Sequence, residues 1–377
     1  MKMSPRLPLA LLACTVALPA FAQVTATLSP LTSFGGGDGW LAPGEGGYTF
    51  LTTGTTERGL AYSSITNHLY LVSRAGGNNV RILNPATGAD LGTLNVTGIA
   101  GGTFTIDMVS VGDDGAIYVG NLCSNTAAAN PFKIYKWDNE AAAPAVVFSN
   151  SLTNTERIGD TLDAIGAGAS TVLVAGFGNT TSGYLLIDPT AGTSSKVAIA
   201  STVAGDFRSG ITFADTVNTV WGDPGSPGVR QTTWSGTIGG AVTGTLQGTM
   251  TLADTIERPL DIALINGAWI MATVEAGTTA ADHDDVRLWD VTDAVINHNN
   301  NKTLLATLNL TTSFTATSGG NGDIEWGTIN PDGTATLYAM ATANGIQAFN
   351  VAVVPEPSSL ALLTVTAIGL MGRRRRR

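Results

Sequence analysis

The stretch Glu257–Leu310, which begins Glu-Arg-Pro-Leu-Asp-Ile-Ala-Leu, carries a pattern that recurs along the chain. Glu-Arg pairs also stand at Glu57-Arg58 and Glu156-Arg157, so the three pairs are 99 and 101 positions apart, and Arg208 falls midway between the last two. Each arginine is followed by a short apolar run, a turn, and a second run rich in Val, Tyr, Leu or Trp. Such a fixed period indicates a repeat architecture.

Each repeat contains four short strands. In the first full unit, apolar-alternating runs occupy residues 59–62, 68–73, 80–83 and 90–96, and turn sequences separate them. Alternation with a period of two predicts a four-stranded meander. Further units begin at Thr105, Leu162, Arg208, Glu257 and Asp323, and the last of them has only three strands.

The first strand of the chain completes this last unit. Ala26-Thr-Leu and Thr32-Ser-Phe recur with the same spacing at Ala306-Thr-Leu and Thr312-Ser-Phe, at the end of the fifth repeat. Residues 24–34 are therefore expected to pair with the last repeat, beside Ile346–Val351. One orphan strand and one three-stranded unit close a ring and leave few exposed sheet edges.

These patterns predict an all-β fold, a β-propeller of six four-stranded blades closed by an N-terminal strand. A seventh blade is the alternative if residues 207–256 or the leading loop 35–47 hide another unit. A parallel β-helix needs shorter coils, and paired sandwiches would not repeat Glu-Arg at this interval. The pattern resembles WD-repeat and YVTN-type propellers in architecture only.

Composition narrows the range of partners. Only 13% of the residues are charged and 46 are glycine, which suits short strands and tight turns better than amphipathic helices. Seven of the 19 basic residues are Lys2, Arg6 and Arg373 to Arg377, and without them the chain carries 12 basic and 29 acidic residues, a formal charge of −17. Such a surface repels phosphate backbones, so no nucleic-acid partner is expected.

The N-terminus predicts export. Residues 1–22 have a basic start, the apolar stretch Leu7–Leu18 and a small-x-small site ending at Ala22, as a secretory signal does. Leu11-Leu12-Ala13-Cys14 is the alternative, a lipoprotein box. If the leader is removed, Cys123 is the one remaining cysteine, and a buried apolar role is favoured over a reactive one.

The C-terminus adds a sorting signal. Pro355-Glu356-Pro357 is followed by the apolar run Leu360–Leu370 and by five arginines, Arg373 to Arg377. Prolines end the preceding strand, the apolar run enters a bilayer, and the arginines stay on its cytoplasmic side. These three parts in order resemble the PEP-CTERM sorting signal of Gram-negative bacteria. The resemblance implies an exosortase-like partner, transient membrane insertion of the tail, and release or transfer to the cell surface.

The predicted organisation thus has three parts. Residues 1–22 form the signal peptide, residues 23–352 the propeller, and residues 353–377 the sorting tail. The mature protein is expected at the cell surface or outside the cell.

Four carboxylates are the candidate metal ligands. Asp107, Asp163, Asp261 and Asp323 each stand in the first strand of their unit, and first strands line the channel of a propeller. They predict either a partial ring around a cation such as Ca²⁺ or structural bonds to backbone N–H groups of the adjacent blade. The first-strand arginines (Arg58, Arg157, Arg208 and Arg258) are expected near one rim, paired with acids. The acidic loop Asp282–Asp285 is a second, weaker candidate for a cation.

Catalytic signatures are scarce. The chain has three histidines and lacks a Gly-x-Ser-x-Gly elbow, a P-loop, a Cys-x-x-Cys motif and a His-Glu-x-x-His motif. The leading interpretation is a non-enzymatic propeller that binds or scaffolds in the cell envelope or exopolysaccharide matrix, with no cofactor other than the Ca²⁺ considered above. The alternative is an extracellular glycan hydrolase or lyase that uses carboxylates at the channel mouth.

Overall fold

A computed structural model describes residues 23–356, apart from residues 154, 180, 225–227, 253–255, 280–283 and 318–320. The predicted signal cleavage site at Ala22 and the part of the tail from Pro357 onward lie outside the described residues. Among the residues described, no helix combines the length and the apolar character that a membrane crossing requires.

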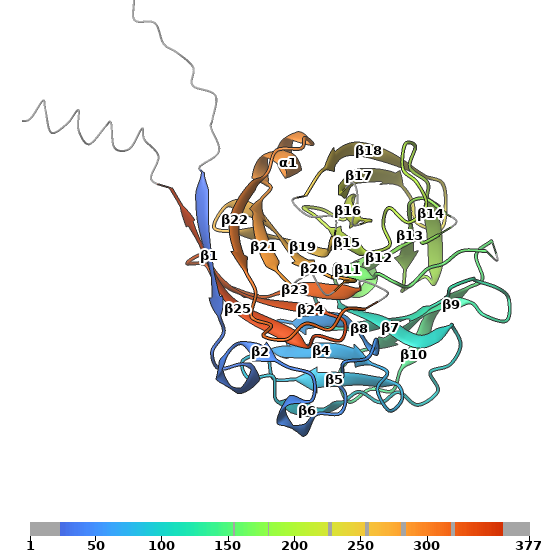
Figure 1. Ribbon diagram of the computed structural model, residues 1–377. Coiled ribbons are helices and arrows are strands. Elements are labelled where there is room, and N and C mark those ends of the chain that lie inside the picture. Colours follow the sequence, from blue (N-terminus) through green and yellow to red (C-terminus); the bar gives the residue numbers. More distant parts are fainter. Residues whose placement is uncertain are drawn as a thin grey trace, which may run out of the picture. The chain divides into compact units, whose positions relative to one another are not determined.

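Residues 24–354 form a β-propeller of six antiparallel blades (Figure 1). The first blade contains β3 (Glu57–Ser63), β4 (His68–Ser73), β5 (Asn79–Leu83) and β6 (Asp90–Thr93). The second contains β7 (Phe104–Val111), β8 (Ile117–Leu122), β9 (Phe132–Trp137) and β10 (Ala145–Asn150). The third contains β11 (Asp163–Ile165), β12 (Val172–Gly176), β13 (Tyr184–Asp188) and β14 (Thr193–Val197).

The second half of the ring repeats this order. The fourth blade contains β15 (Gly210–Phe213), β16 (Thr219–Asp223), β17 (Val229–Gly236) and β18 (Val242–Met250). The fifth contains β19 (Glu257–Ile265), β20 (Ala268–Glu275), β21 (Val286–Asp290) and β22 (Thr303–Leu308). The sixth contains β23 (Gly322–Ile329), β24 (Thr334–Ala341), β25 (Ile346–Pro355) and β1 (Val24–Pro30). The prediction of six blades is confirmed, and the divergent stretch 207–256 supplies one of them.

Ring closure takes the predicted form. β1 is the outer strand of the sixth blade and pairs with β25, and Leu31 N–H donates to the carbonyl of Ala348 at 2.9 Å. The short strand β2 (Trp40–Leu41), which the sequence did not predict, pairs with the first two residues of β25. The first and last parts of the described chain are therefore neighbours in one sheet.

Turn chemistry explains why the strands stop where they do. In the Asn84–Gly88 turn, the Asn84 side chain accepts a hydrogen bond from Ala86 N–H at 2.9 Å. The Asp188–Gly192 turn repeats this geometry, with Asp188 accepting from Thr190 N–H at 2.9 Å. Gly88 and Gly192 have φ of 74° and 66°, values that favour glycine. The two segments therefore share one turn chemistry.

A few short helical segments lie outside the blades. The structure has one α-helix among the described residues, α1 (Thr292–Asn297), between β21 and β22, and the sequence pattern did not predict it. Three short 3-10 segments are η1 (Gly35–Gly37), η2 (Glu45–Gly47) and η3 (Gly168–Ser170).

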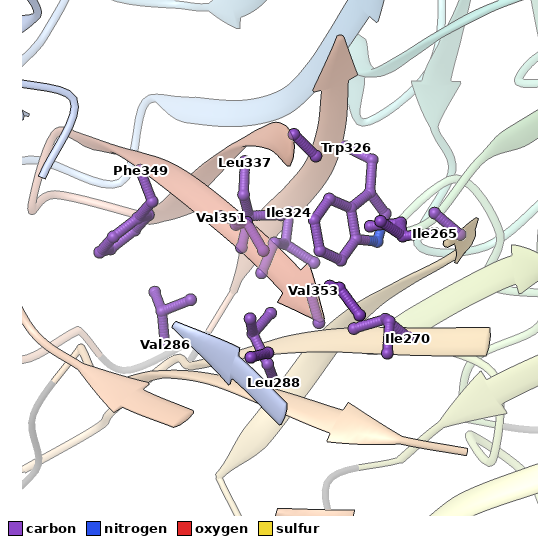
Figure 2. Close-up of a cluster of buried hydrophobic side chains, with 14 of the residues drawn as sticks. Ile265, Ile270, Val286, Leu288, Ile324, Trp326, Leu337, Phe349, Val351 and Val353 are labelled. Atoms are coloured by element: carbon purple, nitrogen blue, oxygen red, sulfur yellow. The ribbon is translucent and has the colours of Figure 1, made fainter. Parts of the chain in front are cut away.

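The core is divided into clusters between neighbouring blades. Figure 2 shows one of them, in which Ile270, Val286 and Leu288 of the fifth blade face Leu337, Phe349 and Val351 of the sixth. All are nearly inaccessible to water. Burial of a side chain of this size stabilises the fold by about 1.5–3 kcal/mol, so these contacts hold adjacent blades in register.

Aromatic residues and the cysteine serve this packing. Six of the seven tryptophans are at most 8% exposed, and Trp269 is partly exposed. Cys123 is buried, and burial raises its pKa to about 11, which keeps the thiol protonated. The predicted burial of Cys123 is confirmed.

Candidate functional site

The innermost strands of the six blades surround the central channel. β3, β7, β11, β15, β19 and β23 contact one another in ring order. Because every blade repeats the same antiparallel order, these strands run in the same direction, so one channel mouth collects their beginnings and the other their ends. The candidate site lies toward the mouth where the inner strands end.

Three carboxylates inside the channel join neighbouring blades. Asp163 on β11 accepts hydrogen bonds from the backbone N–H of Phe213 on β15 (2.8 Å) and from its own neighbour Ala164 (2.7 Å). Each inner strand has one edge without a strand partner, so its N–H groups need acceptors from elsewhere. Asp163 supplies such an acceptor from the preceding blade.

Asp261 and Asp323 repeat this arrangement. Asp261 accepts from Trp326 N–H of the sixth blade at 2.9 Å and from Ile262 N–H at 2.7 Å. Asp323 accepts from Leu60 N–H of the first blade at 2.8 Å. Its second bond, from Ile324 N–H, is 3.1 Å long. Both oxygens of each aspartate are therefore occupied by backbone donors.

Glu325 is a fourth carboxyl in the channel that the sequence interpretation missed. It follows Asp323 by two residues on β23, so both side chains lie on the same face of the strand. One oxygen, Oε1, accepts from Tyr62 N–H at 3.2 Å. The alternation Asp323-Ile324-Glu325 was a usable signal, because residues at i and i+2 of an inner strand both face the channel.

Burial strongly disfavours charge on these groups. It raises the pKa of Asp163 to about 6, although the N–H of Phe213 acts in the opposite direction. Burial and then the nearby Asp163 raise the pKa of Asp261 to about 7. The pKa values of Asp323 and Glu325 lie well above their usual range, mainly through burial and then through the other carboxyls. Partial contact with the channel keeps all four accessible to protons.

A cavity opens from this cluster to the channel mouth. Its volume is about 280 Å³, and its polar lining includes Tyr62, Ser64, Asp113, Asp163, Asp261 and Glu325. A smaller cavity of about 20 Å³ continues inward past Asp323, enough for about one water molecule. The mouth therefore offers a polar recess for a small ligand, and the channel narrows sharply beneath it.

Asp107 lies away from the other three predicted aspartates. It is 1% exposed and accepts a hydrogen bond from Arg74, with Arg58 Nε 3.8 Å from its Oδ1. At the level of Asp163, β7 presents Ser110, whose hydroxyl lies 3.4 Å from the Asp163 carboxylate. The pairing of β7 with β8 is irregular between Phe104 and Met108, and this shift in register was invisible in the sequence.

Metal binding by the aspartate ring stays a prediction. Over the ranges that the structure describes, no group of three or more His, Cys, Asp or Glu residues has an arrangement able to hold a metal ion. In the second candidate, the loop 282–285, Asp282 and His283 lie outside the described residues. Asp163, Asp261 and Asp323 have the backbone bonds that the structural alternative predicted, whereas Asp107 pairs with arginines.

Comparison with protein-family models gives two matches. Residues 49–222 match a domain of unknown function, DUF4623, and residues 353–377 match the PEP-CTERM protein-sorting motif. The predicted sorting tail is thereby confirmed. A search of the curated proteins returns no match.

Several solved structures share the fold. A DUF4623 family protein from Bacteroides eggerthii has a TM-score of 0.62 at 16% identity, over 81% of this chain and 72% of that one. The allergen Mala s 1 of Malassezia sympodialis has a TM-score of 0.51 at 11% identity, over 80% and 94% of the two chains. A gluconolactonase from Xanthomonas campestris has a TM-score of 0.50 at 10% identity, over 81% and 88%. At these identities the likeness extends to the fold alone.

Proposed function

We propose that this exported propeller binds a small polar ligand, such as a sugar unit of the exopolysaccharide matrix or of the cell envelope, at the mouth where its inner strands end. In this proposal the protein binds and releases the ligand without altering it chemically. Export is supported by the sorting motif at residues 353–377. Processing by an exosortase-like enzyme then places the propeller at the cell surface or releases it.

The bonding of the channel aspartates carries the proposal. A carboxylate that works as nucleophile or general base needs an oxygen directed at the substrate. Asp163, Asp261 and Asp323 instead have one oxygen bound by a backbone N–H group of the next blade and the other by the N–H of the following residue. With both oxygens already bonded, these aspartates have no oxygen free to direct at a substrate, so their geometry favours a structural role.

The recess itself suits hydrogen bonding to a neutral polar ligand. Glu325 and Asp113 supply acceptors and Ser64 supplies a hydroxyl, while a volume of about 280 Å³ suits a ligand of one or two sugar rings. Trp326 is 6% exposed, so recognition would rest on polar groups rather than on stacking against its ring.

A glycan hydrolase or lyase is the second candidate. One observation favours it: the pKa values of Asp163 and Asp261 are raised to about 6 and about 7, close to the range useful for a general acid. Glu325 would then be the group with an oxygen available to the substrate.

One experiment separates the two functions. Purified full-length protein is titrated with oligosaccharides from the producing cell's own matrix by calorimetry, and the same mixtures are assayed for new reducing ends and unsaturated products. Binding without products, weakened roughly tenfold by Glu325→Gln, supports the binding protein. Product formation that Glu325→Gln abolishes would establish the enzyme instead, and no binding at all would refute both.

A further inference from the structure

The opposite channel mouth, where the inner strands begin, carries arginines that the proposed function does not use. Arg58 is the second residue of β3, while Arg157 and Arg208 lie in the segments that lead into β11 and β15, the inner strands of the third and fourth blades. Arg74, the residue after β4, belongs with them because it and Arg58 both pair with Asp107. These four arginines, with Asp107 and Asp160, are here called the basic mouth.

The ion pairs of the basic mouth form two groups, each with two arginines and one aspartate. Asp160 is shared by Arg157, whose Nη2 lies 2.6 Å away, and by Arg208, whose Nε lies 3.5 Å away. Asp107 is shared in the same way by Arg58 and Arg74. Four guanidiniums therefore face two carboxylates, an excess of two positive charges in a chain whose body is strongly acidic.

The glutamates next in sequence offset little of this excess, although Glu57 acts electrostatically on Arg74. Glu57 and Glu156 are each 1% exposed, and alternation along an extended chain directs them away from Arg58 and Arg157. Burial raises the pKa of Glu57, which disfavours its charge, and threonine groups occupy one of its oxygens. Glu156 has Lys196 within 3.8 Å as its own counter-charge.

Arg58 has unused hydrogen-bonding capacity. Its guanidinium is held near Asp107 only by an ion pair of 3.8 Å, which is longer than a hydrogen bond, and its buried Nε has no acceptor. Arg74, in contrast, donates to Asp107 and to the carbonyls of Thr55 and Ile106. A side chain that is 12% exposed and lacks acceptors needs them from water or from a ligand.

We propose that the basic mouth binds a small oxyanion, a carboxylate or a phosphate such as a sugar acid or sugar phosphate presents. Planar guanidiniums bind both groups with paired N–H donors. A long polyanion is disfavoured because the surrounding body carries a large negative charge and repels every unit outside the mouth. Arg58 and Arg208 supply the donors, and Arg74 and Arg157 set the local potential.

The test is calorimetric titration of the full-length protein at pH 7 and low ionic strength. Sodium glucuronate and sodium phosphate are the probes, and glucose and sodium chloride at equal ionic strength are the blanks. Anion binding is expected with both probes or with one of them, which identifies the preferred group. Arg58→Gln should weaken it roughly tenfold, because one charge-assisted pair is lost.

Arg81→Gln is the matched control, because Arg81 pairs with Asp90 on the outer strands of the same blade and should leave affinity within about twofold. If Arg58→Gln fails to fold by circular dichroism, Arg208→Gln, whose side chain is 33% exposed, makes the same comparison. Heats equal to those of sodium chloride, or equal effects of Arg58→Gln and Arg81→Gln, would overturn the proposal. Loss of anion binding in Glu325→Gln would place the anion at the other mouth and also overturn it.

Discussion

Replacing Asp163 with asparagine should change the pH dependence of stability. In the folded chain the pKa of Asp163 is raised to about 6, whereas an unfolded aspartate titrates near 3.9. The folded state therefore binds the proton more tightly than the unfolded state. Its contribution to stability is fully present below about pH 4 and is lost as the pH rises through about 6.

The structure sets the size of the effect. A pKa of about 6 instead of an ordinary 3.8 corresponds to about 3 kcal/mol lost between pH 4 and pH 8, and contact with channel water makes this an upper bound. Asparagine keeps one acceptor oxygen for Phe213 N–H or Ala164 N–H but turns an NH₂ group toward the other. That mismatch costs about 1–3 kcal/mol at every pH. Asp163→Asn should therefore be less stable than the natural protein at pH 4.5, and the difference should vanish or reverse by pH 8.

Urea unfolding followed by tryptophan fluorescence at pH values from 4.5 to 8 measures this difference. Asp332→Asn is the control, because Asp332 is an exposed turn residue whose pKa is lowered by its bonds to Thr334. Because this lowered pKa keeps Asp332 charged throughout the range, the cost of its replacement should stay constant from pH 4.5 to 8. A gap between Asp163→Asn and the natural protein that stays constant across the range would refute the account of the channel carboxyls.

Three further outcomes follow from the termini and the aspartate ring. Deleting residues 24–34 removes the strand beside β25, so stability should fall by at least about 2 kcal/mol and aggregation should rise, measured by urea unfolding and light scattering; an equally stable monomer would contradict the closure of the ring. Alanines in place of Pro355-Glu356-Pro357 should leave an uncut precursor in the inner membrane, and mass spectrometry that finds Arg373–Arg377 on the mature natural protein would count against sorting. Millimolar calcium should leave the melting temperature unchanged, because the aspartates already bind backbone N–H groups; a rise of several degrees that Asp163→Asn combined with Asp261→Asn abolishes would establish a metal site.

The blades could be predicted because their signal is local. Alternation and turn residues such as Asn84–Gly88 act within a few residues, and the recurrence of the Glu-Arg pairs showed that the same unit repeats. Ring closure could also be predicted, because residues 24–34 contain two short sequences that recur at the end of the fifth repeat. The strand β2 was not, because two residues, Trp40 and Leu41, carry no periodicity.

The site was harder to predict because its geometry depends on register between strands. Asp107 occupies a first strand as Asp163 does, yet an irregularity in β7 sets it three residues from the matching level, which Ser110 occupies instead. Glu325 was missed although it alternates correctly with Asp323. Sequence alone places a side chain on a strand, but the partner strand determines how deep in the channel it lies.

The recurrence of aspartate in the inner strands has a physical cause that needs no ligand. An inner strand is paired on one side only, so N–H groups along its other edge require acceptors. A carboxylate from the preceding blade accepts a hydrogen bond from one such N–H, and its other oxygen accepts one from the next residue of its own strand, as in Asp163, Asp261 and Asp323. Matching polar residues in a propeller channel are therefore weak evidence for binding. Stronger evidence is a polar group with bonding capacity left over, and Glu325 at one mouth and Arg58 at the other meet that condition.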